Sequence, residues 1–123
     1  MSKVEKIKQF NTLMETFLGQ ISPLVGTSYK HYYGKLVKAN AIMPIKQFYQ
    51  YVSPYKHKIV AKDESYFRET DNFKEQITGD HIFQEIIRLT NIYDKLDEAN
   101  KTQMWMYFQA LLVLSEEYSK LAN

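Results

Sequence analysis

Apolar residues near the N-terminus recur every three or four positions, which is the period of one helical face. These positions are Val4, Ile7, Phe10, Leu13, Met14, Phe17, Leu18 and Ile21. Charged and amide side chains fill most of the positions between them, so the pattern predicts an amphipathic helix. We expect this helix to stop within residues 19–23, because that segment holds both a glycine and a proline.

Two shorter helices are predicted next. Thr27 or Ser28 can cap a second helix that ends at Asn40. The apolar face of this helix consists of Tyr29, Tyr32, Tyr33, Leu36 and Val37. Pro44 suits the first turn of a third helix, and Pro54 ends it because proline disfavours helical geometry in the residue before it.

The segment 55–79 has the least regular pattern of the chain. Ile59 and Val60 fit either a short helix or an extended link. Asp63 suits the cap of a following turn that contains Tyr66 and Phe67.

A strong helical pattern then begins at Thr78 or Asp80 and continues to Leu96. Its apolar positions are Ile82, Phe83, Ile86, Ile87, Leu89, Ile92, Tyr93 and Leu96.

The last predicted helix is apolar on nearly every side. Asn100 and Gln103 have the spacing of a capping box, which predicts its start. From Met104 to Leu114 few polar residues interrupt it, a pattern typical of a helix surrounded by other helices. We expect Trp105 to lie at the centre of the packing.

These elements predict an all-α fold. No stretch alternates apolar and polar residues over the length of a strand, and no repeat or long linker divides the chain. The prediction is one α-helical domain over residues 1–123, a compact bundle of about five main helices with one or two short ones.

Composition narrows the functional classes. The chain has no cysteine, which excludes disulfides, thiolate metal sites and cysteine nucleophiles. Residues 1–8 are charged where a signal peptide would be apolar, and the longest aliphatic run, 110–114, is far shorter than the ~20 residues that cross a bilayer. We therefore expect an intracellular protein that is not secreted and has no membrane partner.

The small net charge of +2 conceals a strong asymmetry along the chain. Residues 16–62 hold seven lysines and no acid, whereas residues 63–123 hold twelve acids and six cations. The cations are mostly lysine, and Arg68 and Arg88 are the two arginines. Because arginine is the usual reader of base edges, this composition disfavours sequence-specific binding of nucleic acid.

Seven of the ten tyrosines lie between Tyr29 and Tyr66, alongside these lysines, and this pattern predicts a basic, tyrosine-rich contact surface. The residues expected to bind a partner are Tyr29, Lys30, His31, Tyr33, Lys35, Lys38, Lys56, Lys58 and Lys62. Three interpretations stay open: docking onto another protein, including the acidic half of a second copy in a homo-oligomer; binding of a nucleic-acid backbone; or a merely solvated face.

Catalytic and metal-binding patterns are weak. His31, His57 and His81 lie in separate segments, and no HExxH motif, glycine-rich phosphate loop or GxSxG turn occurs. A metal-assisted hydrolase built from Asp63, Glu64, His81 and Glu85 is a third hypothesis. We expect no enzyme, no cofactor and no metal.

Three stretches resemble a group of viral proteins. They are IMPIKQFYQYVSPY at 42–55, IVAKDESYF at 59–67 and NKTQMWMYFQALLVLSEEY at 100–118. In outline these resemble small helical proteins of nucleocytoplasmic large DNA viruses, the giant viruses. The resemblance implies a viral protein made in the host cytoplasm and packed in virions or bound to another viral component, and it carries over no catalytic residue.

The predicted function is thus a non-enzymatic protein-interaction or structural module of viral origin. The alternative is an accessory protein that binds nucleic acid without sequence preference.

Overall fold

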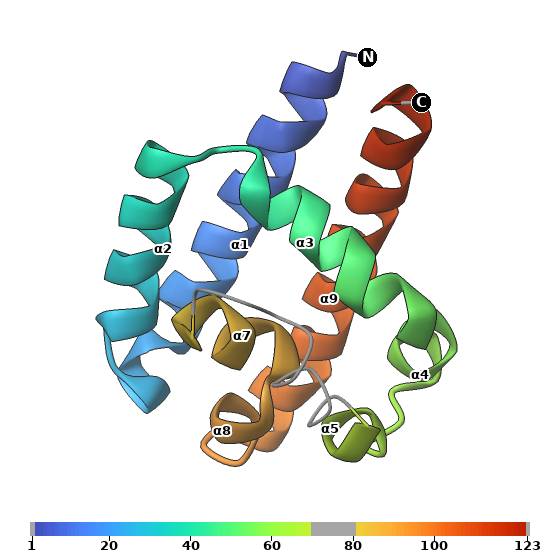
Figure 1. The fold of residues 1–123 in the computed structure, drawn as a ribbon. Helices are drawn as coiled ribbons and strands as arrows, with labels where there is room; N and C mark the ends of the chain where they lie inside the picture. Colours follow the sequence, from blue (N-terminus) through green and yellow to red (C-terminus); the bar gives the residue numbers. More distant parts are fainter. Residues whose placement is uncertain (1, 70–80, 123) are drawn as a thin grey trace.

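Two long antiparallel helices, α1 (Lys3–Val25) and α9 (Glu98–Ala122), form the central pair of the fold (Figure 1). The computed structural model describes residues 2–69 and 81–122. Lys6 Nζ lies 3.1 Å from Glu117 Oε2 at one end of the pair. At the other end Gln20 donates a hydrogen bond of 3.1 Å to the Asn100 side chain, which fixes the antiparallel register.

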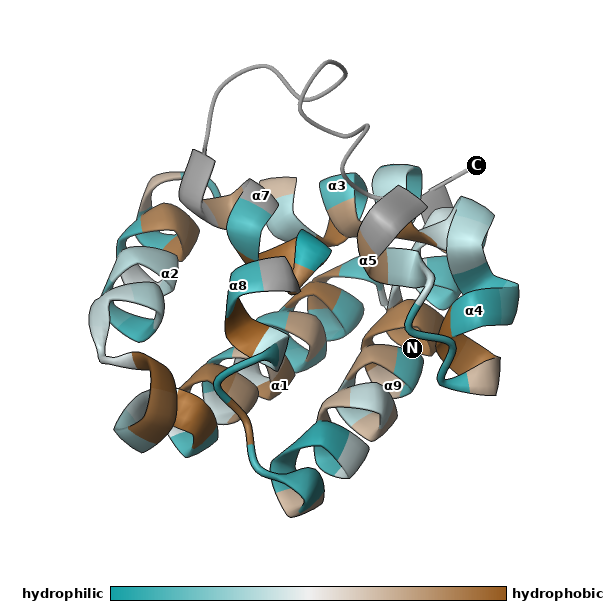
Figure 2. Cartoon of the chain, turned by 90° about the horizontal axis from the view of Figure 1, so that it is seen from below, coloured by the Kyte–Doolittle hydropathy of each residue, from teal (hydrophilic) through white to brown (hydrophobic). Residues whose placement is uncertain are grey.

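The remaining elements pack around this pair. They are α2 (Ser28–Ala39), α3 (Met43–Val52), a 3₁₀ turn η1 (Ser53–Tyr55), α4 (Lys56–Ala61), α5 (Tyr66–Glu69), α7 (His81–Arg88) and α8 (Thr90–Tyr93). Figure 2 shows α2 beside α1, α4 beside α9, and α3, α7 and α8 stacked on one side of the pair. None of the residues within 2–69 and 81–122 lies in a strand, which confirms the predicted all-α class.

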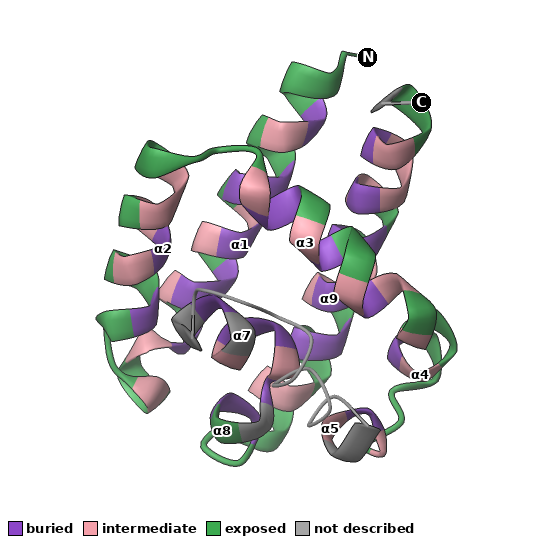
Figure 3. Cartoon of the chain, in the orientation of Figure 1, coloured by how far each residue is buried: buried purple, intermediate pink, exposed green. Residues whose placement is uncertain are grey.

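An aromatic column joins α3 to the central pair. The ring of Phe48 lies 5.3 Å from Phe10 on α1 and 5.3 Å from Phe108 on α9, edge-on in both cases. Edge-to-face rings at this distance add to the gain from burial itself. All three side chains are fully buried, and Figure 3 shows the buried residues gathered where α1, α3, α7 and α9 meet.

A second aromatic cluster surrounds Trp105, which is buried as the sequence predicted. Phe67 of α5 lies 5.7 Å from the indole, and Tyr93 of α8 lies 6.0 Å from it. The short helices α5 and α8 therefore contact α9 through tilted aromatic rings.

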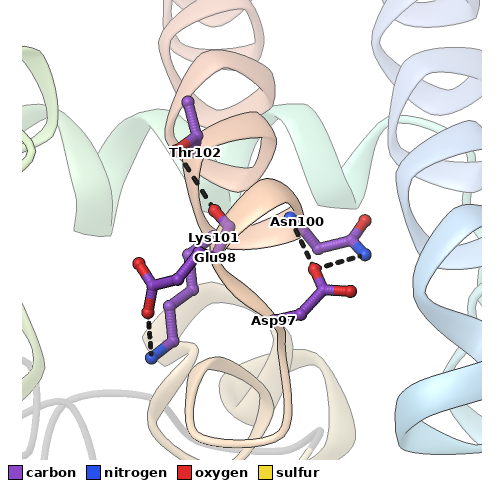
Figure 4. A network of polar contacts seen from close by, with 5 residues as sticks. All are labelled: Asp97, Glu98, Asn100, Lys101 and Thr102. Carbon is purple, nitrogen blue, oxygen red and sulfur yellow. Dashed lines mark hydrogen bonds and ion pairs between the residues drawn. The ribbon is translucent and has the colours of Figure 1, made fainter.

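The start of α9 differs from the predicted capping box. Asp97, and not Asn100, supplies the cap: its Oδ1 accepts hydrogen bonds of 2.9 Å from the backbone and the side-chain amide of Asn100 (Figure 4). Gln103, the expected second half of the box, bonds instead to Gln20 of α1. Gln103 thus makes a contact between helices α9 and α1 in place of the expected capping bond within α9.

Two predicted boundaries are wrong. Helix α1 does not stop within residues 19–23 but continues through Pro23 to Val25, and it ends at Gly26, whose φ is 92°. The predicted helix up to Leu96 is broken at Leu89, which has a φ of 63°. That left-handed residue costs about 1–2 kcal/mol, and the break coincides with complete burial of the Leu89 and Ile92 side chains.

The expectation that other helices surround α9 is also wrong for one side. Met106 and Val113 point away from the core and are 58% and 52% exposed. No described element covers this side of the α1–α9 pair, so the fold leaves an apolar helix face in contact with water.

Candidate interaction surfaces

The predicted basic, tyrosine-rich surface begins on α2, and α2 separates its tyrosines from its lysines. Tyr29 and Tyr33 point inward and are 9% and 0% exposed, so neither ring can contact a partner on the surface. This corrects the prediction that both belong to the contact surface. Both rings follow the apolar period of the helix, which the core uses before any partner can.

Each of the two phenols has a partner inside the protein. The Tyr33 hydroxyl donates a hydrogen bond of 2.8 Å to Asn11 Oδ1, and Asn11 Nδ2 donates one of 3.0 Å to the Ala41 carbonyl. The Tyr29 hydroxyl donates to Glu85 Oε2 at 3.1 Å. Burial, then the hydrogen bond and charge of Glu85, raise the pKa of Tyr29 to about 12. Burial likewise raises the pKa of Tyr33 well above its ordinary value, so both phenols stay neutral donors.

The cations of α2 lie on its outward side. Together with α1 they line a hollow of about 360 Å³, which we call the basic groove. Its lining consists of Glu15, Lys30, His31, Gly34, Lys35 and Lys38. The structure therefore brings together four of the nine predicted contact residues.

The other three predicted lysines lie at the opposite edge of the molecule, on and after α4 (Figure 1). Lys56 Nζ is 3.0 Å from Glu116 Oε2, and Lys58 Nζ is 2.6 Å from Ser65 Oγ and 3.7 Å from Asp63 Oδ2. The predicted single basic surface is thus two separate regions, and acidic side chains compensate the α4 region.

A second surface, which the sequence pattern did not predict, runs between α1 and α9. Two adjoining hollows of about 710 and 380 Å³ share Leu13 and Ala110, and we call them together the apolar groove. The apolar side chains that line it are Leu13, Met106, Tyr107, Ala110, Val113 and Leu114. The available signal was the apolar character of α9 on every side, because a helix lacking a polar face needs cover on every face.

Polar residues form the rim of the apolar groove. They are Lys8, Gln9, Thr12, Thr16 and Gln103. Lys8 is the one charged side chain among the described residues that line the two hollows. An apolar floor with a polar rim is the usual composition of a protein-contact site.

The carboxylates proposed for a hydrolase serve as structural hydrogen-bond acceptors. Asp63 Oδ1 accepts a hydrogen bond of 2.9 Å from the Ser65 backbone, and this bond is the first cause of a lowered pKa at Asp63. Glu85 accepts the Tyr29 phenol. Burial raises the pKa of Tyr93 to about 12, and its hydrogen bond to Glu64 adds to this increase.

The His81 side chain lies outside the described residues, so the complete hydrolase hypothesis remains untested. Among the side chains that are described, no three of the His, Cys, Asp and Glu type gather in a way that could hold a metal ion.

Comparisons with known proteins identify no relative: no family model, no curated protein and no solved structure matches this chain. The resemblance to giant-virus proteins stays a prediction. In the described parts of the chain, no helix combines the length and the apolar character that a membrane span requires.

Proposed function

We propose that the protein is a non-enzymatic interaction module that binds an amphipathic helix of a partner protein in its apolar groove. The observation that carries the proposal is the exposure of Met106 and Val113, each more than half accessible in the middle of a long, well-packed helix. Contiguous apolar surface of this kind, rimmed by polar residues, is typical of protein-interaction sites.

The dimensions of the groove fit a helical ligand. Its lining extends along α9 from Gln103 to Leu114, which is three turns or about 16 Å of helix at 1.5 Å per residue. A groove between two parallel or antiparallel helices accepts a third helix whose apolar side chains recur at positions i, i+3 or i+4, and i+7. Ala110 lies at the centre and is small enough to let a partner helix approach closely.

Charge favours a foreign helix over a second copy. Lys8 on the rim would gain from a carboxylate on the ligand, whereas the described residues that line the apolar groove include no carboxylate. The expected partner is therefore an amphipathic helix with aliphatic anchors and a glutamate or aspartate near one end. Under the giant-virus prediction this partner is another viral component.

The test uses a panel of labelled amphipathic helical peptides with aliphatic anchors and glutamates, titrated by fluorescence anisotropy. Val113→Gln should weaken the best binder at least about tenfold, because a buried anchor contact contributes 1.4 kcal/mol or more. Val60→Gln is the matched control, since Val60 lies on α4 outside the groove and is 58% exposed against 52% for Val113.

Equal binding by the two variants would refute the apolar groove as the site. Light scattering of the wild type and of Val113→Gln tests whether a second copy of this chain occupies the apolar groove instead. If the wild type is a dimer and Val113→Gln is a monomer, the groove binds a second copy of this chain. That result would refute the proposal that it binds a helix of a partner protein.

A further inference from the structure

Two lysines of the basic groove lie on the same side of α2, with a glycine between them. Lys30, Gly34 and Lys38 are four residues apart, so they lie one above the other along one side of α2. At 1.5 Å per residue, Lys30 and Lys38 originate about 12 Å apart on the helix. A Cβ added to Gly34 would meet nothing within 4 Å, so the space between the two lysines is open.

Within the described residues, little negative charge lies beside the lysines of this groove. Lys30, Lys35 and Lys38 belong to none of the ion pairs formed within residues 2–69 and 81–122. Among the described residues that line the groove, Glu15 supplies the single carboxylate. On α4, by contrast, Lys56 and Lys58 have acidic neighbours. The two lysine regions therefore differ in the field that they present to an anion.

We propose that the basic groove binds the phosphate backbone of a nucleic-acid duplex, independently of the apolar groove. Lysine ammonium groups neutralise phosphates without reading bases, and the described lining residues include no arginine that could read them. Among the described lining residues, His31 carries the one aromatic ring, and the larger rings of Tyr29 and Tyr33, on which bases could stack, are buried in the core. Single strands are usually held by stacking their bases on such rings, whereas the bases of a duplex are already stacked on one another.

The same composition disfavours two other anionic partners. An acidic peptide would find no apolar side chain among the described lining residues to anchor it, and anchors supply most of the affinity in protein interfaces. A membrane surface would require α2 to insert its apolar face, yet that face is packed through Tyr29 and Tyr33 into the protein core.

The experiment is a titration of a short labelled DNA duplex with the full chain at about 50 and 200 mM salt. Three lysine contacts predict a salt slope of about −2.7, so affinity should fall roughly 40-fold between these two salt concentrations. Lys35→Gln/Lys38→Gln should reduce the magnitude of the slope by about 2, one for each phosphate contact. Lys46→Gln/Lys62→Gln removes the same charge from two exposed lysines outside the groove and should leave the slope unchanged.

A second pair of variants tests the gap itself. Gly34→Glu and Gly34→Gln add side chains of nearly equal size in the open space, but only the first adds a negative charge. We expect Gly34→Glu to weaken duplex binding at least about tenfold more than Gly34→Gln does. Circular dichroism of each variant confirms that the helices are retained.

Several results would overturn the proposal. One is the absence of duplex binding at about 50 mM salt up to 100 μM protein, since non-specific complexes already form at about 10⁻⁴ to 10⁻⁶ M at physiological salt. Others are equal losses in the two double-lysine variants, tighter binding of a single strand than of the duplex, or displacement of the duplex by poly-glutamate at equal charge. The last result would assign the groove to an acidic protein.

Discussion

Helices α2 and α9 lie on either side of α1, and they differ in the side that they turn outward. The outward side of α2 carries lysines over a buried row of tyrosines, the ordinary arrangement of an amphipathic helix. The outward side of α9 carries Met106, Ala110 and Val113 over an inner row that is equally apolar. The side chains of α2 are thus apolar toward the core and polar toward water, whereas α9 exposes apolar side chains to water.

This difference separates two kinds of exposed surface. Removing the charged outward side chains of α2 from water carries a large desolvation penalty. Only a strongly anionic partner can offset this penalty. Removing those of α9 from water is favourable by about 25 cal/mol per Å² of apolar surface. The two helices therefore suit partners of different chemistry, a polyanion on α2 and an apolar helix on α9.

The largest effect is expected from truncating the inner side of α9. Phe108→Ala should lower the free energy of unfolding by about 3–5 kcal/mol, because it leaves a cavity beside Phe17 and Phe48. Met106→Ala, two residues earlier on the outward side, should change it by less than about 0.5 kcal/mol. Urea denaturation of both variants measures the contrast, and similar losses would show that the outward side is covered in solution.

The inner side of α2 is expected to come second. Tyr33→Phe keeps the buried ring but removes the donor to Asn11 Oδ1, so a buried acceptor loses its hydrogen bond. The free energy of unfolding should fall by about 1–3 kcal/mol. Tyr49→Phe is the control, because Tyr49 is 37% exposed and water can replace its contacts. A neutral Tyr33→Phe variant would indicate that the Tyr33–Asn11 bond contributes little to the order of the core.

These two helices also show what the sequence could predict. The 3.6-residue period of α2 fixed which side is buried, and the lysines of α2 do meet in one groove as expected. The sequence could not show that α4 lies at the opposite edge, since the placement of α3 and η1 between them depends on packing of Phe48 and other distant residues. It therefore merged two separate lysine regions into one surface.

For α9 the sequence contained the signal, but the interpretation was wrong. An apolar helix with no polar side is consistent with a fully surrounded helix or with one that awaits a partner. The two cases differ only in the number of elements available to cover it, which is a property of the tertiary structure. The break at Leu89 was hidden for the same reason, because the buried Ile92 continues the apolar period across it.

A smaller effect is expected at high pH from the inner side of α2. The pKa of Tyr29 is about 12 in the folded protein, against about 10 in an unfolded chain. Above pH 10 the unfolded state therefore holds fewer protons than the folded state, and stability falls as pH rises toward 12. The contribution is fully present below pH 10. Urea midpoints at pH 9, 10 and 11 should decline less steeply in Tyr29→Phe than in the wild type. Equal declines in the two proteins would contradict a raised pKa of Tyr29 in the folded state.

The gap in the basic groove allows a stabilising change. Gly34 lies inside α2 with open space around its missing Cβ, so Gly34→Ala should raise the free energy of unfolding by about 0.5–1 kcal/mol. Gly26→Ala is the opposite case, because Gly26 ends α1 with a φ of 92° and a ψ of 164°, where alanine should cost about 1–3 kcal/mol. Thermal unfolding of both variants compares them. A destabilised Gly34→Ala would mean that another part of the protein occupies the space beside Gly34.

The smallest effect on stability is expected on the outward side of α9, and it is the most informative. Met106→Gln/Val113→Gln should change the free energy of unfolding by less than about 0.5 kcal/mol, since both side chains are already more than half exposed. If the apolar groove is empty in the isolated protein, this holds at every protein concentration. If a second copy covers it, the wild-type midpoint rises with concentration and the double variant loses that rise, because association stabilises only the folded state. Melting curves at several protein concentrations therefore distinguish an isolated protein with an empty apolar groove from one whose apolar groove is covered by a second copy of the chain.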